Sequence, residues 1–216
     1  MYKDFIEDRI NVFLEEFEKL IIKENIPITN FLYKECDYKT DNTLPEIDDS
    51  FTLFTPYINR WGGKKDKHAW FYNEIQVPEH WNGEIQLAVA SDARLGWCDI
   101  NPQFIAYVDG KLQQGIDKNH REVFLTNGTH KVYLYAYSGS VHDEYVDFVT
   151  NLQLIDAKTK QLYYDIKVPF EILAYEDENS RNYFEIKKHL NNALNFIDMR
   201  SPYSDEYYAS LDKAID

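Results

Sequence analysis

One stretch, Asn101 to Leu125, most constrains what this chain can fold into. Phe104, Ala106 and Val108 alternate with Gln103, Ile105 and Tyr107, and this period of two is typical of a strand. Asp109-Gly110 follows, and this pair favours a tight hairpin turn because Gly adopts positive φ without steric cost. The chain then returns over Lys111–Ile116 and continues into a third run, Arg121–Leu125. A meander of this length cannot bury a face alone, so the stretch predicts further strands packed against it.

The same period extends from Phe51 to Asp156. Ile85, Leu87 and Val89 are expected to point inward, as is Val108, and Thr129–Ser138 places its three tyrosines on the opposite face from its apolar residues. Short runs of this kind, separated by Gly, Pro and Asn turns, predict a β-sandwich. The predicted fold is therefore mainly β, a jelly-roll or galactose-binding-like β-sandwich with flanking N- and C-terminal helices.

Helical periodicity brackets the strands. Apolar residues from Ile6 to Leu20 recur at three- and four-residue steps, and Asp4 with Glu7 fits a capping box. This helix could dock onto another protein or pack on its own domain. We expect residues 1–50 to hold the helix and an irregular connector, residues 51–156 the sandwich, and residues 157–216 a helical linker.

Within the linker, two helices are expected, over Ile166–Ala174 and Arg181–Met199. Pro169 is expected in a first helical turn, where its missing N–H costs little. Ser204 is expected to cap a final helix that runs through Ala214.

Composition excludes several classes of partner. The formal net charge of −14 argues against nucleic acid and against an anionic membrane surface. Cys36 and Cys98 are the only cysteines, and the sequence contains no Cys/His cluster. A structural zinc site is therefore not expected. The N-terminus lacks a signal-peptide pattern, and no run reaches membrane-spanning length. We therefore expect a cytoplasmic protein.

The motifs of this central region resemble the N-terminal β-domain of the bacterial and vacuolar-type α-mannosidases, glycoside hydrolase family 38. The matching residues keep their order along the chain. They are Trp61-Gly62-Gly63, His68–Phe71, Val77–Trp81, Tyr107–Gly110, Gln114–Asp117, Asn119–Glu122 and the linker segment Asp198–Ser204.

This resemblance implies a function for the chain. It would be the N-terminal non-catalytic supporting domain of an enzyme that hydrolyses α-mannosides, and its partner would be that enzyme's own catalytic domain, which the chain does not reach. The resemblance also implies a divalent metal such as zinc in the absent catalytic domain, no cofactor here, and a full-length protein that can form a homo-oligomer. The metal signature of the family begins with His-x-Asp, and this sequence contains no such triplet.

Two alternatives stay open at this point. The chain could be an independent carbohydrate-binding module for mannosides, which should present two or more exposed aromatic side chains in a concave patch. It could also be an enzyme by itself, but no catalytic constellation is visible, so no catalytic or metal-binding residue is assigned.

The candidate residues for a domain interface or a sugar contact are Trp61, Trp97, Asn119, His120 and Arg121. For the Asn119–Arg121 loop, the competing interpretation is an internal network that satisfies loop carbonyls and Glu122. For the tryptophans, the competing interpretation is burial in the core, where large rings usually lie.

Overall fold

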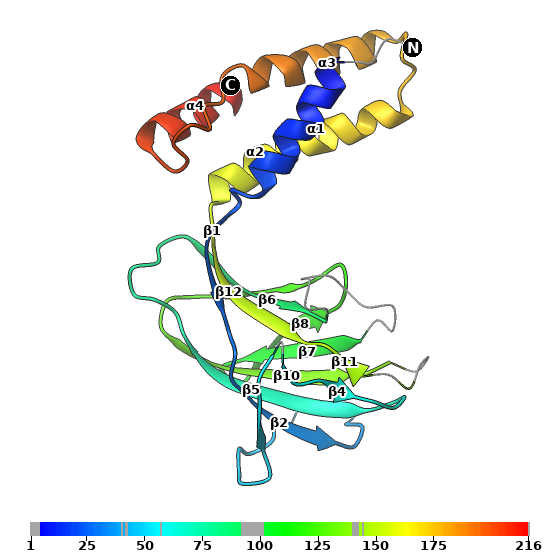
Figure 1. Ribbon diagram of the computed structural model, residues 1–216, viewed down its shortest axis with the longest axis vertical. Coiled ribbons are helices and arrows are strands. Elements are labelled where there is room, and N and C mark those ends of the chain that lie inside the picture. The colour runs from blue at the N-terminus through cyan, green and yellow to red at the C-terminus, as the bar shows by residue number, and fades with distance from the viewer. Residues whose placement is uncertain are drawn as a thin grey trace. The chain divides into compact units, whose positions relative to one another are not determined.

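The computed structural model describes residues 5–39, 41, 43–56, 58–91, 102–139, 143 and 145–215. The chain forms two compact units. We call Glu24–Leu154 the β unit, and Met1–Lys23 together with Ile155–Asp216 the helical unit. Figure 1 shows strands gathered in the first and helices in the second. The fold is thus mixed, with antiparallel sheets in a sandwich-like core and four α-helices, three of them C-terminal, among the described residues.

The elements follow one another in this order: α1 (Phe5–Glu18), β1 (Ile22–Pro27), β2 (Phe31–Cys36), β3 (Thr52–Phe54), β4 (Trp61–Gly62), β5 (His68–Gln76), β6 (Glu84–Ala90), β7 (Gln103–Val108), β8 (Lys111–Ile116), β9 (Glu122–Leu125), β10 (Thr129–Tyr137), β11 (Tyr145–Val146), β12 (Val149–Ile155), α2 (Ala157–Ile172), η1 (Leu173–Tyr175), α3 (Arg181–Leu194) and α4 (Asp205–Ile215).

Two sheets make the sandwich. One has four strands in the order β1-β12-β6-β9, and the other has six in the order β3-β2-β5-β10-β7-β8. In the six-stranded sheet β10 lies antiparallel between β5 and β7. A short pair, β4 with β11, is also antiparallel.

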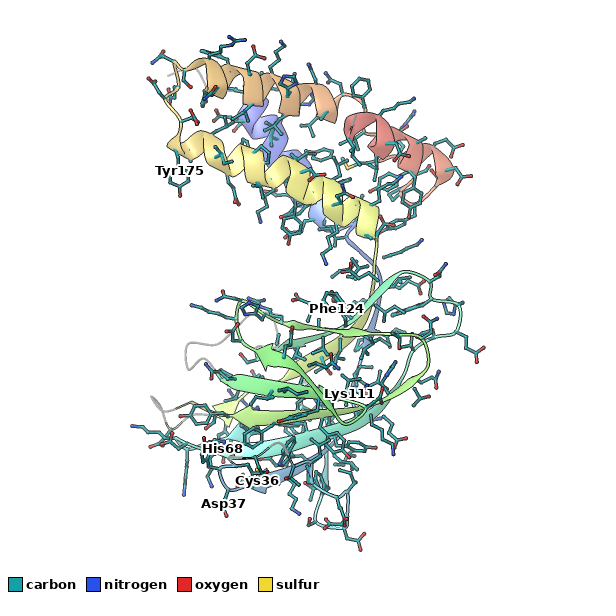
Figure 2. All side chains as sticks on the ribbon, turned by 180° about the vertical axis from the view of Figure 1, so that it is seen from behind. Cys36, Asp37, His68, Lys111, Phe124 and Tyr175 are labelled. Atoms are coloured by element: carbon teal, nitrogen blue, oxygen red, sulfur yellow. The ribbon has the colours of Figure 1, made fainter. Side chains whose placement is uncertain are left out.

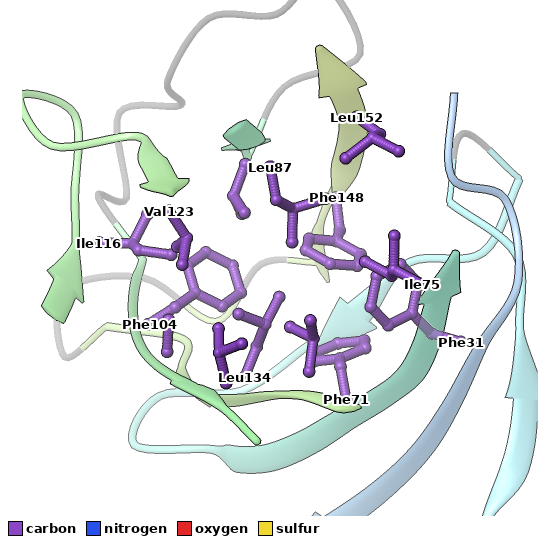
Figure 3. Close-up of a cluster of buried hydrophobic side chains, with 14 of the residues drawn as sticks. Phe31, Phe71, Ile75, Leu87, Phe104, Ile116, Val123, Leu134, Phe148 and Leu152 are labelled. Carbon is purple, nitrogen blue, oxygen red and sulfur yellow. The ribbon is translucent and has the colours of Figure 1, made fainter. Parts of the chain in front are cut away.

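The main core lies between the two sheets. Ile85, Leu87 and Val89 face inward from β6, as the alternation predicted, and Val108 is also buried. Figure 3 shows the aromatic centre of this cluster, where Phe71 lies 4.7 Å from Phe148 between ring centroids. Aromatic rings supply large apolar area for each residue, and this explains how short strands can hold a shared core.

The predicted hairpin is confirmed. Asp109 and Gly110 connect β7 to β8, and both have positive φ, 50° and 80°. The Asp109 side chain further fixes the turn, since its Oδ1 accepts a hydrogen bond from the Lys131 backbone N–H at 2.9 Å and its Oδ2 lies 2.7 Å from Nδ1 of His130. Asp109 is therefore more than a turn residue, because it connects the hairpin to β10.

The helical unit has its own core. Phe17 of α1 is fully buried, lies 4.9 Å from Phe13 and packs with Tyr207 and Leu211 of α4. The open question about the N-terminal helix is thereby answered, since α1 packs against the C-terminal helices of the same chain. The units consequently differ from the expected segments 1–50, 51–156 and 157–216.

Three expectations about secondary structure differ from the structure. The stretch Asn25–Asp49 is irregular only in part, because β2 pairs with β5 inside the six-stranded sheet, whereas the described residues from 37 to 49 lie in no helix or strand. The helix predicted from Ile166 begins earlier, at Ala157, where the Asp156 side chain accepts a hydrogen bond from the Thr159 N–H. Pro169 therefore lies inside α2 and not in a first turn. Ser204 does accept a hydrogen bond from the Tyr207 N–H before α4, as expected of a cap.

Candidate functional site

The β unit has a depression of about 620 Å³ on the outer face of its six-stranded sheet. Its floor follows the strand register, which places His68 of β5 beside Tyr137 of β10, and Tyr137 beside Gln103 of β7. In the next row Tyr135 lies beside Ile105, and Ile105 beside Gly115 of β8. Because paired residues lie on the same side of a sheet, these residues gather from four strands.

Gly115 lines the depression and has no side chain to occupy it. A Cβ built there would meet only the Phe104 carbonyl oxygen, at 3.9 Å, which is an ordinary contact. The residue has no positive φ that would require Gly. The backbone conformation at position 115 therefore does not require Gly, and the absence of a side chain leaves space in the depression.

Aromatic rings form the floor and one wall. The His68 imidazole stacks between two tyrosines, with its centroid 5.5 Å from the Tyr135 ring and 5.0 Å from the Tyr137 ring. Tyr38 lies 5.4 Å from His68 in a tilted arrangement, and 69% of its surface is exposed. Figure 2 shows His68 at the same end of the sheet as Cys36, with which it is in register. Tyr38 thus offers a free ring face beside an ordered stack.

Polar groups surround these rings. The Tyr137 hydroxyl donates a hydrogen bond to Oδ1 of Asp66 at 2.6 Å. Asp117 lines the other side, and its Oδ1 accepts hydrogen bonds from the backbone N–H groups of Asn119 and His120 at 2.8 and 2.9 Å. The Gln103 amide also lines the depression. Donors and acceptors of several kinds therefore converge on one small volume.

The protonation states follow from these surroundings. Burial lowers the pKa of His68 below its ordinary value, and burial raises the pKa of Tyr135. Hydrogen bonds from the backbone of Asn119 lower the pKa of Asp117. At neutral pH the His68 imidazole and the Tyr135 phenol are therefore neutral, and the Asp117 side chain is a carboxylate.

His68 is also in contact with the Tyr135 hydroxyl. The Tyr135 hydroxyl oxygen accepts a hydrogen bond from the Lys39 backbone N–H at 3.0 Å and lies 3.0 Å from Nδ1 of His68. The hydroxyl can donate to an unprotonated Nδ1 or accept from a protonated one, so this contact fits either tautomer of His68. Such an arrangement can bind a flat, polar molecule by stacking and hydrogen bonding.

The loop Asn119–Arg121 lies next to this site but does not line it. Asp117 Oδ1 holds the loop backbone and is 3.2 Å from Nδ1 of His120. Arg121 Nε donates to the Lys118 carbonyl oxygen at 2.9 Å, and the Arg121 N–H donates to Glu122 at 3.2 Å. These contacts form the local network that was the competing interpretation. The role of Asn119, His120 and Arg121 at an interface or a sugar stays a prediction.

The tryptophans among the described residues are buried and do not line the depression. Trp61 is 2% exposed, and its ring packs on Phe71 and Phe104 at 5.6 and 5.9 Å. A ring so enclosed offers no face to a sugar in this structure. Trp81 is also buried and donates from Nε1 to Glu24 at 2.9 Å. Trp97 lies outside the described residues.

A second hollow of about 620 Å³ lies in the helical unit between α2, α3 and α4. Most of its lining is apolar, and at its margin Phe196 and Ile215 are 53% and 42% exposed. Polar residues such as Asp165 and His189 also line it. This surface differs in character from the depression, because apolar side chains rather than hydrogen-bonding groups dominate it.

No group of three or more His, Cys, Asp or Glu side chains among the described residues lies close enough to hold a metal ion. In that same part of the chain no helix is both long and apolar enough to cross a bilayer.

Sequence reasoning missed the residues that line the depression, above all Tyr38, Asp66, Gln103 and Tyr137. One signal was present, since the tyrosines of Thr129–Ser138 were expected on the face opposite the core. What the sequence could not supply was the register that sets His68 beside Tyr137, residues 69 positions apart in the chain. Pairings of that range depend on the whole sheet.

No family model matches the chain, and no curated protein matches it. Among solved structures, the chain is similar to part of several β-glucuronidases. One from an uncultured Clostridium species has a TM-score of 0.42 at 7% identity, over 62% of this chain and 29% of that one. One from Ruminococcus gnavus, in complex with D-glucuronic acid, has a TM-score of 0.41 at 10% identity, over 61% and 29%.

A third, β-glucuronidase 2 of Bacteroides uniformis, has a TM-score of 0.39 at 13% identity, over 60% of this chain and 18% of that one. The chain thus spans less than a third of the length of these proteins. The named proteins are glycoside hydrolases, but not α-mannosidases. At this TM-score and identity the similarity carries no argument about function.

Proposed function

We propose that the chain is the N-terminal, non-catalytic supporting region of an α-mannosidase. The β unit would then be a jelly-roll or galactose-binding-like sandwich, and the helical unit would lead toward the catalytic domain. The observation that supports this proposal is where the family-like motifs lie. Tyr107–Gly110 forms a strand end and its hairpin, and Asn119–Glu122 forms a loop held by Asp117 and a strand start. The motifs that carry the resemblance therefore serve the fold, as expected of a supporting domain.

The apolar hollow of the helical unit suits a contact with the enzyme's own catalytic domain. Exposed Phe196 and Ile215 would be covered in that contact, and burial of such side chains stabilises association by about 25 cal/mol for each Å² of apolar surface. Metal chemistry, with zinc as the expected ion, would belong to the catalytic domain.

The first experiment separates a supporting region from an enzyme. Residues 1–216 are incubated with 4-nitrophenyl α-mannoside, with and without zinc, and no turnover above a contaminant control is expected. A retaining glycosidase needs two carboxyl groups about 5 Å apart across the scissile bond, and the sequence offers no recognisable pair. Metal-dependent turnover by this chain alone would overturn the proposal.

The second experiment tests the contact. In a longer protein that joins this chain to an α-mannosidase catalytic region, Phe196→Gln with Ile215→Gln should lower the melting temperature or the activity. Phe184→Gln is the matched control, because Phe184 is 59% exposed but does not line the hollow. Equal behaviour of the two variants would exclude this surface as the contact.

A carbohydrate-binding module is the second candidate, and the depression on the six-stranded sheet favours it. That site meets the criterion set for a binding module in part, with exposed Tyr38 and half-buried Tyr137 in one concave region. The two candidates are compatible, because an accessory region can support an enzyme and hold its substrate.

A further inference from the structure

The depression of the β unit contains charged groups of only one sign. Among its described lining residues, Asp66 and Asp117 carry charge and none is Lys or Arg. Lys67, a neighbour in sequence, is 3.5 Å from Glu35, an acidic group outside the lining. The chain as a whole is also acidic, at −14. An anion entering this site would therefore meet carboxylates without a lining cation to offset them.

The same carboxylates suit a ligand rich in hydroxyl groups. Oδ1 of Asp66 is engaged by Tyr137, and Oδ1 of Asp117 by the loop backbone. Within the described part of the chain, Oδ2 of each carboxylate has no hydrogen-bond donor and can accept from a ligand hydroxyl. Hydrogen bonds to ionised acceptors are stronger than those between neutral groups. The Gln103 amide adds a donor and an acceptor in the same hollow.

The rings supply the complementary apolar contact. Tyr38 has an exposed face, and the His68–Tyr137 stack beside it is fixed by the sheet register and by the Tyr135 hydroxyl. The apolar face of a pyranose ring can lie on such a surface while its hydroxyl groups point to the polar margin. The open space above Gly115 extends the site by one small group.

We propose that this depression binds one neutral pyranose unit and discriminates against hexuronic acids. The inference rests on the proposed carbohydrate-associated function and adds the place and the ligand class to it. Tyr38 supplies the stacking face, Asp66 and Asp117 accept ligand hydroxyl groups, and their negative charge excludes a sugar carboxylate.

The test compares methyl α-D-mannopyranoside with sodium D-glucuronate by calorimetric titration into the full 216-residue chain. The mannoside should bind at least about tenfold more tightly than the glucuronate, because the latter brings an unpaired negative charge toward two carboxylates. Asp66→Asn should narrow that ratio. Asn tolerates the positive φ of 55° at this position, so the variant should keep the local backbone.

Two further variants locate the site. Tyr38→Ala should weaken mannoside binding about tenfold by removing the stacking face, and Gly115→Leu should do the same by filling the depression. Gln113→Leu is the matched control, because it lies on the same strand outside the lining and should leave binding unchanged. Melting curves of all variants separate a lost site from a lost fold.

The outcomes are distinct. Mannoside binding that is unaffected by both Tyr38→Ala and Gly115→Leu would place the sugar elsewhere and overturn the inference, while leaving a sugar-binding function in place. Glucuronate binding as tight as that of the mannoside would overturn the charge argument. No binding of the neutral sugar would overturn the inference as a whole, but the supporting role would still be decided separately by the contact experiment with the catalytic region.

Discussion

The β unit and the helical unit each contain a hollow of about 620 Å³, yet the two surfaces differ in chemistry. The first combines a stacked His68 with two carboxylates and an amide, and the second is lined mainly by aliphatic side chains and by Phe196. A polar hollow with ring faces suits a small hydroxylated ligand, whereas an apolar one suits another protein surface. Equal volume therefore does not imply equal function.

The units also differ in how they are held together. In the β unit, two sheets share an aromatic core, and the register sets which side chains meet on the outer face. In the helical unit, α1 packs on the C-terminal helices, and Lys187 lies 3.3 Å from Glu7 across α3 and α1. The Tyr183 hydroxyl donates to the same Glu7 carboxylate, which raises the pKa of Tyr183 to about 12. Because each unit has its own core, a core mutation in one unit should destabilise that unit more than the other.

The largest expected effect is from Val108→Asp. Val108 is 7% exposed in the sandwich core, so the substitution buries a charge without a partner. We expect the free energy of unfolding to fall by about 4 kcal/mol or more. Chemical denaturation followed by tryptophan fluorescence measures this change, since the described tryptophans lie in the β unit. An unchanged midpoint would mean that the strand register is wrong.

The matching change in the other unit is Phe17→Ala. Its ring is fully buried and packs on Phe13 and Tyr207, so removal should cost about 3 kcal/mol through lost burial and a cavity. Hydrogen exchange should then accelerate in α2 and α4 more than in β5 and β10. Uniform acceleration over both units would contradict the division into separate cores.

Local features of the β unit could be predicted from its sequence. The pairing of distant strands and the start of α2 could not. The Asp109-Gly110 turn and the inward face of β6 follow from local chemistry, because alternation and turn residues act over a few positions. The pairing of β2 with β5 could not be predicted, because it joins distant segments and β2 has only one fully buried residue, Phe31. The early start of α2 was missed because the cap at Asp156 was not recognised.

The candidate site shows the same limit. The sequence did predict tyrosines on the outward face of Thr129–Ser138. The depression, however, arises only where four strands, β5, β10, β7 and β8, bring together His68, Tyr137, Gln103 and Gly115. The tryptophans were candidates because large rings often bind sugars, yet Trp61 is buried in the core. Packing demand and ligand binding favour the same residue types, so composition alone cannot separate them.

The smallest expected effect concerns the hairpin of the β unit. Hydrogen bonds from His130 and from the Lys131 backbone lower the pKa of Asp109 below its ordinary 3.8. The stabilisation that this carboxylate gives is therefore present above pH 3.8 and is lost as the pH falls through the lowered pKa. Asp109→Asn, which keeps the positive φ accessible, should slightly lower the melting temperature at pH 7, and this difference should shrink as the pH falls through the lowered pKa.

The control for that variant is Asp165→Asn in α2, an exposed position of the helical unit. It should leave the pH dependence of the melting temperature unchanged. A loss that stays the same size throughout an acid titration of the melting temperature would show that the ionised form of Asp109 does not contribute to the hairpin.

The most direct test of the account is to map sugar binding onto the two units of one molecule. The ¹⁵N-labelled chain is titrated with methyl α-D-mannopyranoside, and amide chemical-shift changes are followed by NMR. The account predicts saturable changes at Asp66, His68, Ile105, Gly115 and Tyr137, with none around Phe196 in the helical unit. Changes confined to the helical unit, or none at all at saturating sugar, would contradict it.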